Sequence, residues 1–394
     1  MTSTGSLGAR VAVLSLLLSG HATQALAQEV SCLDLESPIF GLGGSAAKPL
    51  IGRLATALAA DDEPITVVFK APGACHAINA FIDEEPLTGT ASYWEPDGTE
   101  KSCTFPLEGV PPDYGYMANT PTACPGVAGL PEGLGSFPGP VTAWNLMVPV
   151  ASTQQSISSE GIYVVYGFGN QSQAAPWTDE SQLFSRNPTS AALLALAAAS
   201  SLPPERFLGI DVETNGNMVT QLSQSPNPEA ALGFASGEVA DANRATVRTL
   251  AYQHKGQTCG YWPDSSAITF DKKNVRDGHY WLWAFHRFYA PVDESGQVAN
   301  PAVRRFFANV TGSAPDPDIP VLDITIDNGT IPRCAMRVTR DGDYTALKPY
   351  ADEAPCHCYF ESRATGSSSC ATCAVDTDCS AAAPHCRHGF CEEE

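Results

Sequence analysis

The stretch that decides the fold reads Phe40-Gly-Leu-Gly-Gly-Ser-Ala-Ala-Lys-Pro-Leu50. Its glycine-rich turn ends at Ser45 and runs into a predicted helix, residues 49–60, whose leucines recur at every fourth position. A turn of this kind leaves bare backbone N–H groups and a hydroxyl at the positive end of a helix. This arrangement suits a small anion, although ordinary helix capping would use the same residues.

Strands and helices alternate along the chain outward from this turn. Residues 64–70 and 141–150 are apolar runs that predict buried strands. Residues 190–201 and 300–310 have the composition and the capping residues of helices. The most aromatic stretch, residues 277–289, is predicted to form a helix in the core. This alternation predicts an α/β fold.

A second helix begins in a way that resembles the first. The run Arg186-Asn-Pro-Thr-Ser190 leads directly into the Ala/Leu-rich stretch. The positively charged guanidinium of Arg186 could donate two parallel hydrogen bonds to a carboxylate, a sulfate or a phosphate. Either helix start alone indicates only a cap, but two of them, one in each predicted half of the protein, indicate an anion site.

These residues resemble a known family. The run 40–50 is similar to the N-terminal signature of bacterial phosphate-binding proteins of ABC uptake systems. The similarity extends to residues 73–78, 186–190 and 230–235, in the order that the family shows, across roughly residues 36–310. The resemblance implies a two-lobed periplasmic-binding-protein type II fold, with the ligand in the cleft between the lobes.

The resemblance also implies which residues bind the ligand. Carried over position by position, it assigns Gly44, Ser45, Arg186 and Ser190 to a small anionic solute such as phosphate. It implies an ABC permease as partner, no cofactor and no metal. The first hypothesis is therefore an exported solute-binding protein, and the alternative is a secreted scaffold or adhesion module that keeps the fold without a solute.

Three positions depart from the family pattern. Ala74 stands where the family has serine, and Ala191-Ala192 stands where it has Gly-Thr. Residues 114–119 contain no aspartate, whereas the family has there a carboxylate that accepts a hydrogen bond from a protonated phosphate. These departures remove contacts to the anion and the group that distinguishes a protonated phosphate.

The first residues predict export. Arg10 precedes the apolar run 11–18, and Ala25-Leu-Ala27 forms a cleavage site typical of a signal peptide. A lipoprotein would need Cys32 as the acylated residue, and the residues before it match that pattern poorly. No other apolar run reaches the roughly 18 residues of a membrane helix, so we predict no membrane span in the mature chain and a periplasmic or secreted protein.

Composition sets the expected domain boundaries. The long middle region holds most of the aromatic residues, and the end of the chain turns to Ser, Thr, Ala and Cys, which cannot build a core without cross-links. The expected division is a signal peptide, 1–27; a binding domain, 28–348, with one lobe from about 30–149 and 233–345 and the other from about 150–232; and a cysteine-rich tail, 349–394.

Thirteen cysteines follow the predicted cleavage site, and in an exported protein they indicate disulfides. Zinc is the weaker alternative, because the tail contains only one C-x-x-C pair. The odd count leaves one thiol without a partner, and the connectivity stays open. We expect the tail to form a disulfide knot of its own, separate from the core, from Cys356, Cys358, Cys370, Cys373, Cys379, Cys386 and Cys391.

Charge and motifs exclude other classes of protein. With 22 Lys+Arg against 43 Asp+Glu and no basic patch, the chain would repel nucleic acid. A serine hydrolase needs a G-x-S-x-G turn, and Gly43-Gly-Ser-Ala-Ala47 lacks the second glycine. We therefore predict that the protein is not an enzyme, with a secreted hydrolase as a distant third hypothesis.

Overall fold

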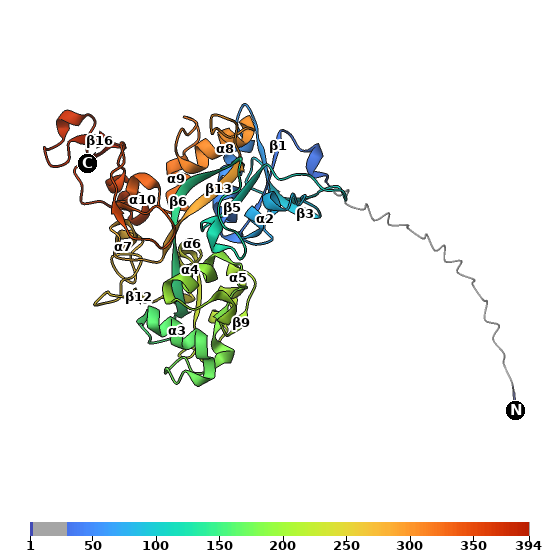
Figure 1. The fold of residues 1–394 in the computed structure, drawn as a ribbon, viewed down its shortest axis with the longest axis vertical. Coiled ribbons are helices and arrows are strands. Elements are labelled where there is room, and N and C mark those ends of the chain that lie inside the picture. The colour runs from blue at the N-terminus through green and yellow to red at the C-terminus, as the bar shows by residue number, and fades with distance from the viewer. Residues whose placement is uncertain (3–29, 394) are drawn as a thin grey trace.

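A computed structural model of the chain describes residues 1–2 and 30–393, so the predicted signal peptide, 1–27, lies almost wholly outside the described residues. Strands and helices alternate along the chain, and the predicted α/β class is confirmed. One long strand, β6 (Leu134–Pro149), runs through the molecule (Figure 1). Helices α3, α4 and α5 gather near one of its ends, and α8, β1 and β5 lie near the other.

The main sheet contains nine strands. Strand β1 is parallel to both of its neighbours, β2 and β5, and the other pairs in this sheet are antiparallel. The strand order is β10 (Gly233–Ser236), β6, β13 (Trp283–Pro291), β5 (Tyr114–Met117), β1 (Pro38–Gly43), β2 (Thr66–Lys70), β3 (Thr90–Trp94) and β4 (Glu100–Thr104), with β11 (Val247–Thr249) also paired to β6.

Strand β6 pairs with different neighbours along its length. Its first part, 134–143, pairs with β13, and its last part, 144–149, pairs with β10 and β11. Residues 139–149 are buried on both faces of the strand, which explains why this segment is apolar without alternation. The strand therefore links the predicted lobes directly, and the lobe boundaries at about 149 and 233 stay a prediction.

The helices begin where their caps predict. Asn300 accepts hydrogen bonds from the amides of Ala302 and Val303 at the start of α8. Ser190 caps α4, nine of whose ten residues are buried. None of the helices among residues 30–393 is both long and apolar enough to cross a membrane. They are α1 (Lys48–Ala59), α2 (His76–Ile82), α3 (Ser159–Phe168), α4 (Ala191–Ser200), α5 (Asn215–Ser223), α6 (Gly237–Ala242), α7 (Lys273–Arg276), α8 (Pro301–Thr311), α9 (Val321–Asp327) and α10 (His357–Thr365).

Four pairs of short strands complete the fold. They are β7 (Ser156–Ser158) with β12 (Ala251–Gln253), β8 (Phe184–Ser185) with β9 (Ile210–Asp211), β14 (Val338–Thr339) with β15 (Lys348–Pro349), and β16 (His385–Arg387) with β17 (Phe390–Glu392).

The helix predicted over residues 277–289 is wrong. Most of this stretch belongs to β13, a central strand between β5 and β6. Residues 283–290 are all buried, because neighbouring elements cover both faces of the sheet. A strand that is buried on both faces has no alternation, so its pattern is the same as that of a core helix.

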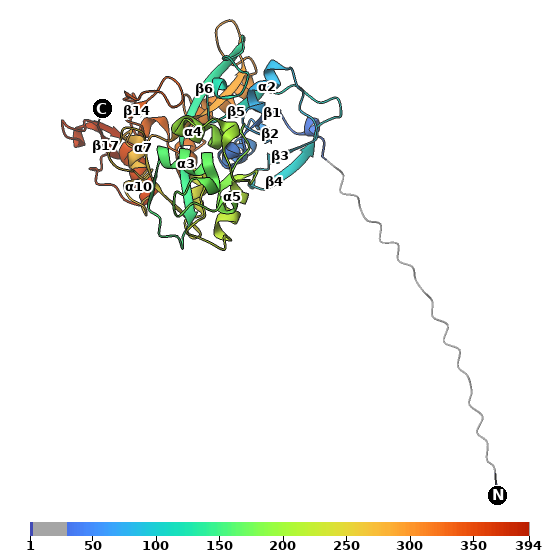
Figure 2. The same ribbon diagram turned by 60° about the horizontal axis from the view of Figure 1, so that its bottom comes forward.

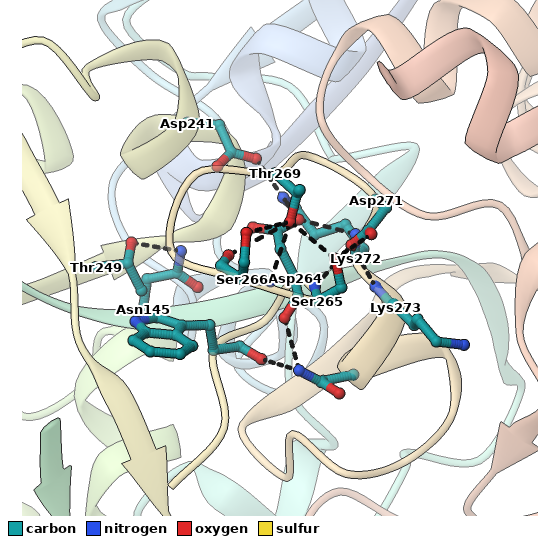
Figure 3. Close-up of polar contacts among 12 residues, drawn as sticks. Asn145, Asp241, Thr249, Asp264, Ser265, Ser266, Thr269, Asp271, Lys272 and Lys273 are labelled. Carbon is teal, nitrogen blue, oxygen red and sulfur yellow. Dashed lines mark hydrogen bonds and ion pairs between the residues drawn. The ribbon is translucent and has the colours of Figure 1, made fainter. Parts of the chain in front are cut away.

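A buried ion network fixes the segment between β12 and β13. The Nζ of Lys272 lies 2.6 Å from an Asp241 carboxylate oxygen and 2.8 Å from one of Asp264 (Figure 3). Arg244 contacts the same two carboxylates, at 2.6 and 2.7 Å. Each charged group of this network thus has partners of opposite sign, which limits the free-energy cost of its burial. The network ties residues 264–272 to α6, which contains Asp241.

Six disulfides are present, and Cys259 is free and exposed. In the tail the sulfur atoms of Cys373, Cys379 and Cys391 lie within 4.8 Å of one another, but each belongs to a disulfide. The pairs are Cys32–Cys103, Cys75–Cys124, Cys334–Cys356, Cys358–Cys370, Cys373–Cys386 and Cys379–Cys391.

The sequence predicts a tail that is separate from the core, and this prediction is wrong. The disulfide Cys334–Cys356 joins it to the binding domain, and Cys356 and Phe360 belong to the main hydrophobic cluster. An α10 arginine, Arg363, pairs with Asp327 of α9 at 2.5 Å. Only the last part of the tail projects, on the side of the molecule opposite β3 (Figure 1, Figure 2). Cysteine density alone does not reveal which part of a tail packs on the core.

Candidate functional site

A cavity of about 90 Å3 lies beside β6. All four residues that the sequence singled out, Gly44, Ser45, Arg186 and Ser190, line it, although 141 residues separate Ser45 from Arg186 along the chain. A space of this size can hold a small oxyanion.

Three helical segments begin at the wall of this cavity. Ser45 opens a short 3-10 helix, Ser45–Ala47, that continues into α1, with Gly44 as its cap. Ser190 caps α4, and Thr214 caps α5. Each start leaves backbone N–H groups and the positive end of a helix dipole at the cavity. The fold thus concentrates partial positive charge there without lysine side chains.

Among the described residues, Arg186 is the one cationic side chain that lines the cavity. It is only 8% exposed, and burial lowers the pKa of its guanidinium, while Asp211 acts in the opposite direction. Its Nη1 donates to the Asn215 side chain at 2.6 Å, and its Nη2 donates to the Glu213 carbonyl at 2.8 Å. Its buried Nε has no acceptor among the described residues. A buried donor without a partner is costly, and an anion in the cavity would be a suitable partner for it.

The two serines differ in their surroundings. The hydroxyl of Ser190 accepts from the amide of Leu193 at 3.3 Å and is buried. Ser45 is half-buried, and within residues 30–393 its hydroxyl has no hydrogen-bond partner. Ser190 can therefore donate its O–H to a ligand while it keeps the cap, and the Ser45 hydroxyl is free to donate or to accept.

Two of the three departures from the family pattern lie at the cavity, whereas residues 114–119 do not line it. Ala74, Ala191 and Ala192 all line it. The serine and threonine hydroxyls that the family has at these positions are therefore absent from the cavity wall. The carboxylate of Glu213 is the single one on the lining residues, and that residue is exposed. The amide oxygens of Asn187 and Asn215 already accept hydrogen bonds, from Thr189 and Arg186. The wall therefore offers mainly donors.

Sequence reasoning missed Asn215, Thr214 and Trp144, which also line the cavity. Thr214 caps α5 by accepting from Asn217, and the pattern Thr-x-x-Asn in that stretch is the one local signal that could have located it. Nothing local distinguishes Asn215 or Trp144, because their places depend on how distant parts of the chain pack.

A polar chain leads from the cavity into the core. Asn215, which holds Arg186, donates to the hydroxyl of Ser236 at 3.3 Å. Two residues later Glu238 lies in the first turn of α6, where it is only 5% exposed and accepts from the Thr142 hydroxyl at 2.8 Å. Burial raises the pKa of Glu238 to about 7; hydrogen bonds from Ser236 and Thr142 oppose the shift, and Asp241 adds to it. A titratable carboxyl group thus lies behind the anion cavity.

Comparisons with known proteins support the fold and nothing finer. No protein-family profile and no curated protein sequence matches the chain. A Clostridium perfringens protein, described as a phosphate ABC transporter substrate-binding protein with bound phosphate, aligns with a TM-score of 0.51 at 12% identity, over 75% of this chain and 99% of its own. An ABC-type phosphate transport receptor from Vibrio cholerae aligns with a TM-score of 0.48 at 14% identity, over 74% of this chain and 99% of its own.

The Clostridium perfringens alignment shows that the chain shares the α/β fold of that protein. The predicted fold class is therefore confirmed, with the disulfide-rich C-terminal region as an addition to it. At 12% identity the likeness extends to the fold alone.

Proposed function

We propose that the protein is an exported solute-binding protein that holds a small tetrahedral anion, such as phosphate, in the cavity lined by Ser45, Arg186 and Ser190. The observation that carries the proposal is the convergence of three helix starts on one buried arginine. Each feature alone is common, but together they supply neutralising charge and backbone donors within a space of oxyanion size.

The proposed two lobes meet at the cavity. Ser45 comes from residues 30–149, and Arg186 and Ser190 come from residues 150–232. An anion that contacts both segments would hold them together, which is how a binding protein gains affinity from closure. In this proposal β6 is the element about which the lobes move, and an ABC permease in the membrane receives the closed form.

One observation favours the alternative, a secreted scaffold without a solute. Both terminal nitrogens of Arg186 already have acceptors within the protein, Asn215 and the Glu213 carbonyl. If no anion displaces these contacts, the arginine serves only to join the β8–α4 loop to α5.

Calorimetry separates the two functions. The full chain, purified without phosphate, is titrated with phosphate and with sulfate. The proposal expects binding of at least one anion, weakened about thirtyfold by Arg186→Ala, because a charge-assisted contact out of water is lost. The matched control is Arg206→Ala, an exposed arginine outside the cavity, which should leave affinity unchanged. Absence of binding to either anion would support the scaffold.

A further inference from the structure

A second, larger hollow adjoins the anion cavity. It has a volume of about 700 Å3, within the range of small-molecule sites. It shares Ser45, Thr214 and Asn215 with the anion cavity, so the two spaces meet at the starts of α1 and α5. We call this larger space the groove. An anion at Ser45 would thus have one side against the cavity wall and the other toward the groove.

The groove differs from the cavity in chemistry. Apolar side chains form much of its wall, namely Pro49, Trp94, Val239 and Ile324. Gly52 lets the Trp94 indole lie directly on α1, because a Cβ at that position would stand only 2.7 Å from the indole Nε1. This wall is suited to an uncharged organic group rather than to a second anion.

One unpaired cation borders the groove. Lys48 is paired with Glu100 at 2.6 Å, whereas Arg53 is exposed and makes no ion pair with any residue in the described part of the chain. A hydrogen bond from Arg363 lowers the pKa of the Asp327 carboxyl, and the charge of Arg53 helps to lower it. The exposed guanidinium of Arg53 adds attraction for a negatively charged ligand. Because its wall is largely apolar, the groove is suited to the organic part of a ligand whose negative charge lies in the cavity.

The donors of the cavity distinguish between free and esterified phosphate. A free phosphate near neutral pH carries a proton on one oxygen, and that O–H needs an acceptor. Apart from the hydroxyl oxygens of Ser45 and Ser190, the side-chain acceptors of the wall are few, because its amide oxygens already accept hydrogen bonds and the carboxylate of Glu213 belongs to an exposed residue. The bridging oxygen of a monoester carries no proton, and it leads to the organic group.

From this geometry we infer that the preferred ligand is a phosphomonoester, with its phosphate in the cavity and its organic group in the groove. The inference rests on the proposed function, since it needs the anion in the cavity. It adds the class of solute and the groove residues that select it.

Four probes test the inference on the full chain by calorimetry: inorganic phosphate, sulfate, phenyl phosphate and phenyl sulfate. Phenyl phosphate should bind at least about tenfold more tightly than inorganic phosphate, because burial of roughly 60 Å2 of apolar surface corresponds to about that factor. A preference for phenyl sulfate over phenyl phosphate would overturn the assignment to phosphate.

The matched variants are Gly216→Trp and Gly216→Ala. Gly216 lines the groove and not the cavity, and a Cβ there would have only the Thr214 hydroxyl within 4 Å, at 3.9 Å. An indole at this position should fill the groove and reduce the affinity for phenyl phosphate to that for inorganic phosphate. The alanine variant adds only a methyl group to the groove, so it should reduce the preference for phenyl phosphate much less than the tryptophan variant does.

The outcomes separate this inference from the function on which it rests. If inorganic phosphate binds as tightly as phenyl phosphate, or if Gly216→Trp weakens both equally, the inference is wrong and the proposed function stands. If none of the four probes binds, both are wrong.

Discussion

Glu238 provides a sharp test of the buried polar chain behind the cavity. The residue is 5% exposed, and one of its carboxylate oxygens accepts from Thr142. The substitution Glu238→Gln keeps the size of the side chain and an oxygen that can accept from Thr142, but it removes the titration. Stability of the wild type and of the variant should therefore depend differently on pH.

The size and sign of the effect follow from the pKa. Burial raises the pKa of Glu238 from an ordinary 4.5 to about 7, so between these values the folded protein holds a proton that the unfolded chain has lost. Stability contributed by this group is fully present below about pH 4.5 and is lost as the pH rises through 7. At about 1.4 kcal/mol for each pH unit, the loss is on the order of 3 kcal/mol.

Urea denaturation followed by tryptophan fluorescence, at several pH values from 4.5 to 8, measures the effect. The free energy of unfolding of Glu238→Gln relative to wild type should rise by on the order of 3 kcal/mol across this range. Any constant cost of the amide group cancels, because the comparison is between pH values. The control is Glu205→Gln at an exposed position, which should keep the wild-type dependence. If Glu238→Gln also keeps it, Glu238 does not titrate as argued.

Three further outcomes are expected. Replacing Cys334 and Cys356 together by serine removes a cross-link over 22 residues and should cost about 3 kcal/mol of unfolding free energy, with faster proteolysis of the tail. Phe306→Ala should cost about 3–5 kcal/mol by thermal denaturation, because its fully buried ring packs against Tyr114 and Phe288, and Phe307→Leu should cost less. Iodoacetamide should label Cys259 alone in the unreduced native protein, since mass spectrometry should find the other twelve cysteines in disulfides.

Local chemistry explains which elements the sequence could predict. Helix α8 was predictable because Asn300 and Pro301 mark its start and its apolar residues recur on one face. Strand β13 was not, because it is buried on both faces and its sequence lacks any alternation. The tail was misjudged because Cys334 lies outside the cysteine-dense segment to which it is bonded.

The candidate site divides in the same way. Ser45 and Ser190 could be found because each combines a turn with a helix start, and Arg186 because it stands close before one of them. The hydrogen bond from Arg186 to Asn215 and the groove beside Ser45 both depend on contacts between segments far apart in sequence. No spacing in the chain encodes such contacts, so only the folded structure reveals them.

The disulfide connectivity bears on how an exported chain would mature. The pairs Cys32–Cys103 and Cys75–Cys124 interleave, so each closes a loop that contains one cysteine of the other. An oxidant that joins thiols in the order in which they emerge would couple Cys32 with Cys75 and trap a wrong isomer. Reaching the native pairs then requires thiol–disulfide exchange, so a host that oxidises without reshuffling should yield little correctly bonded protein.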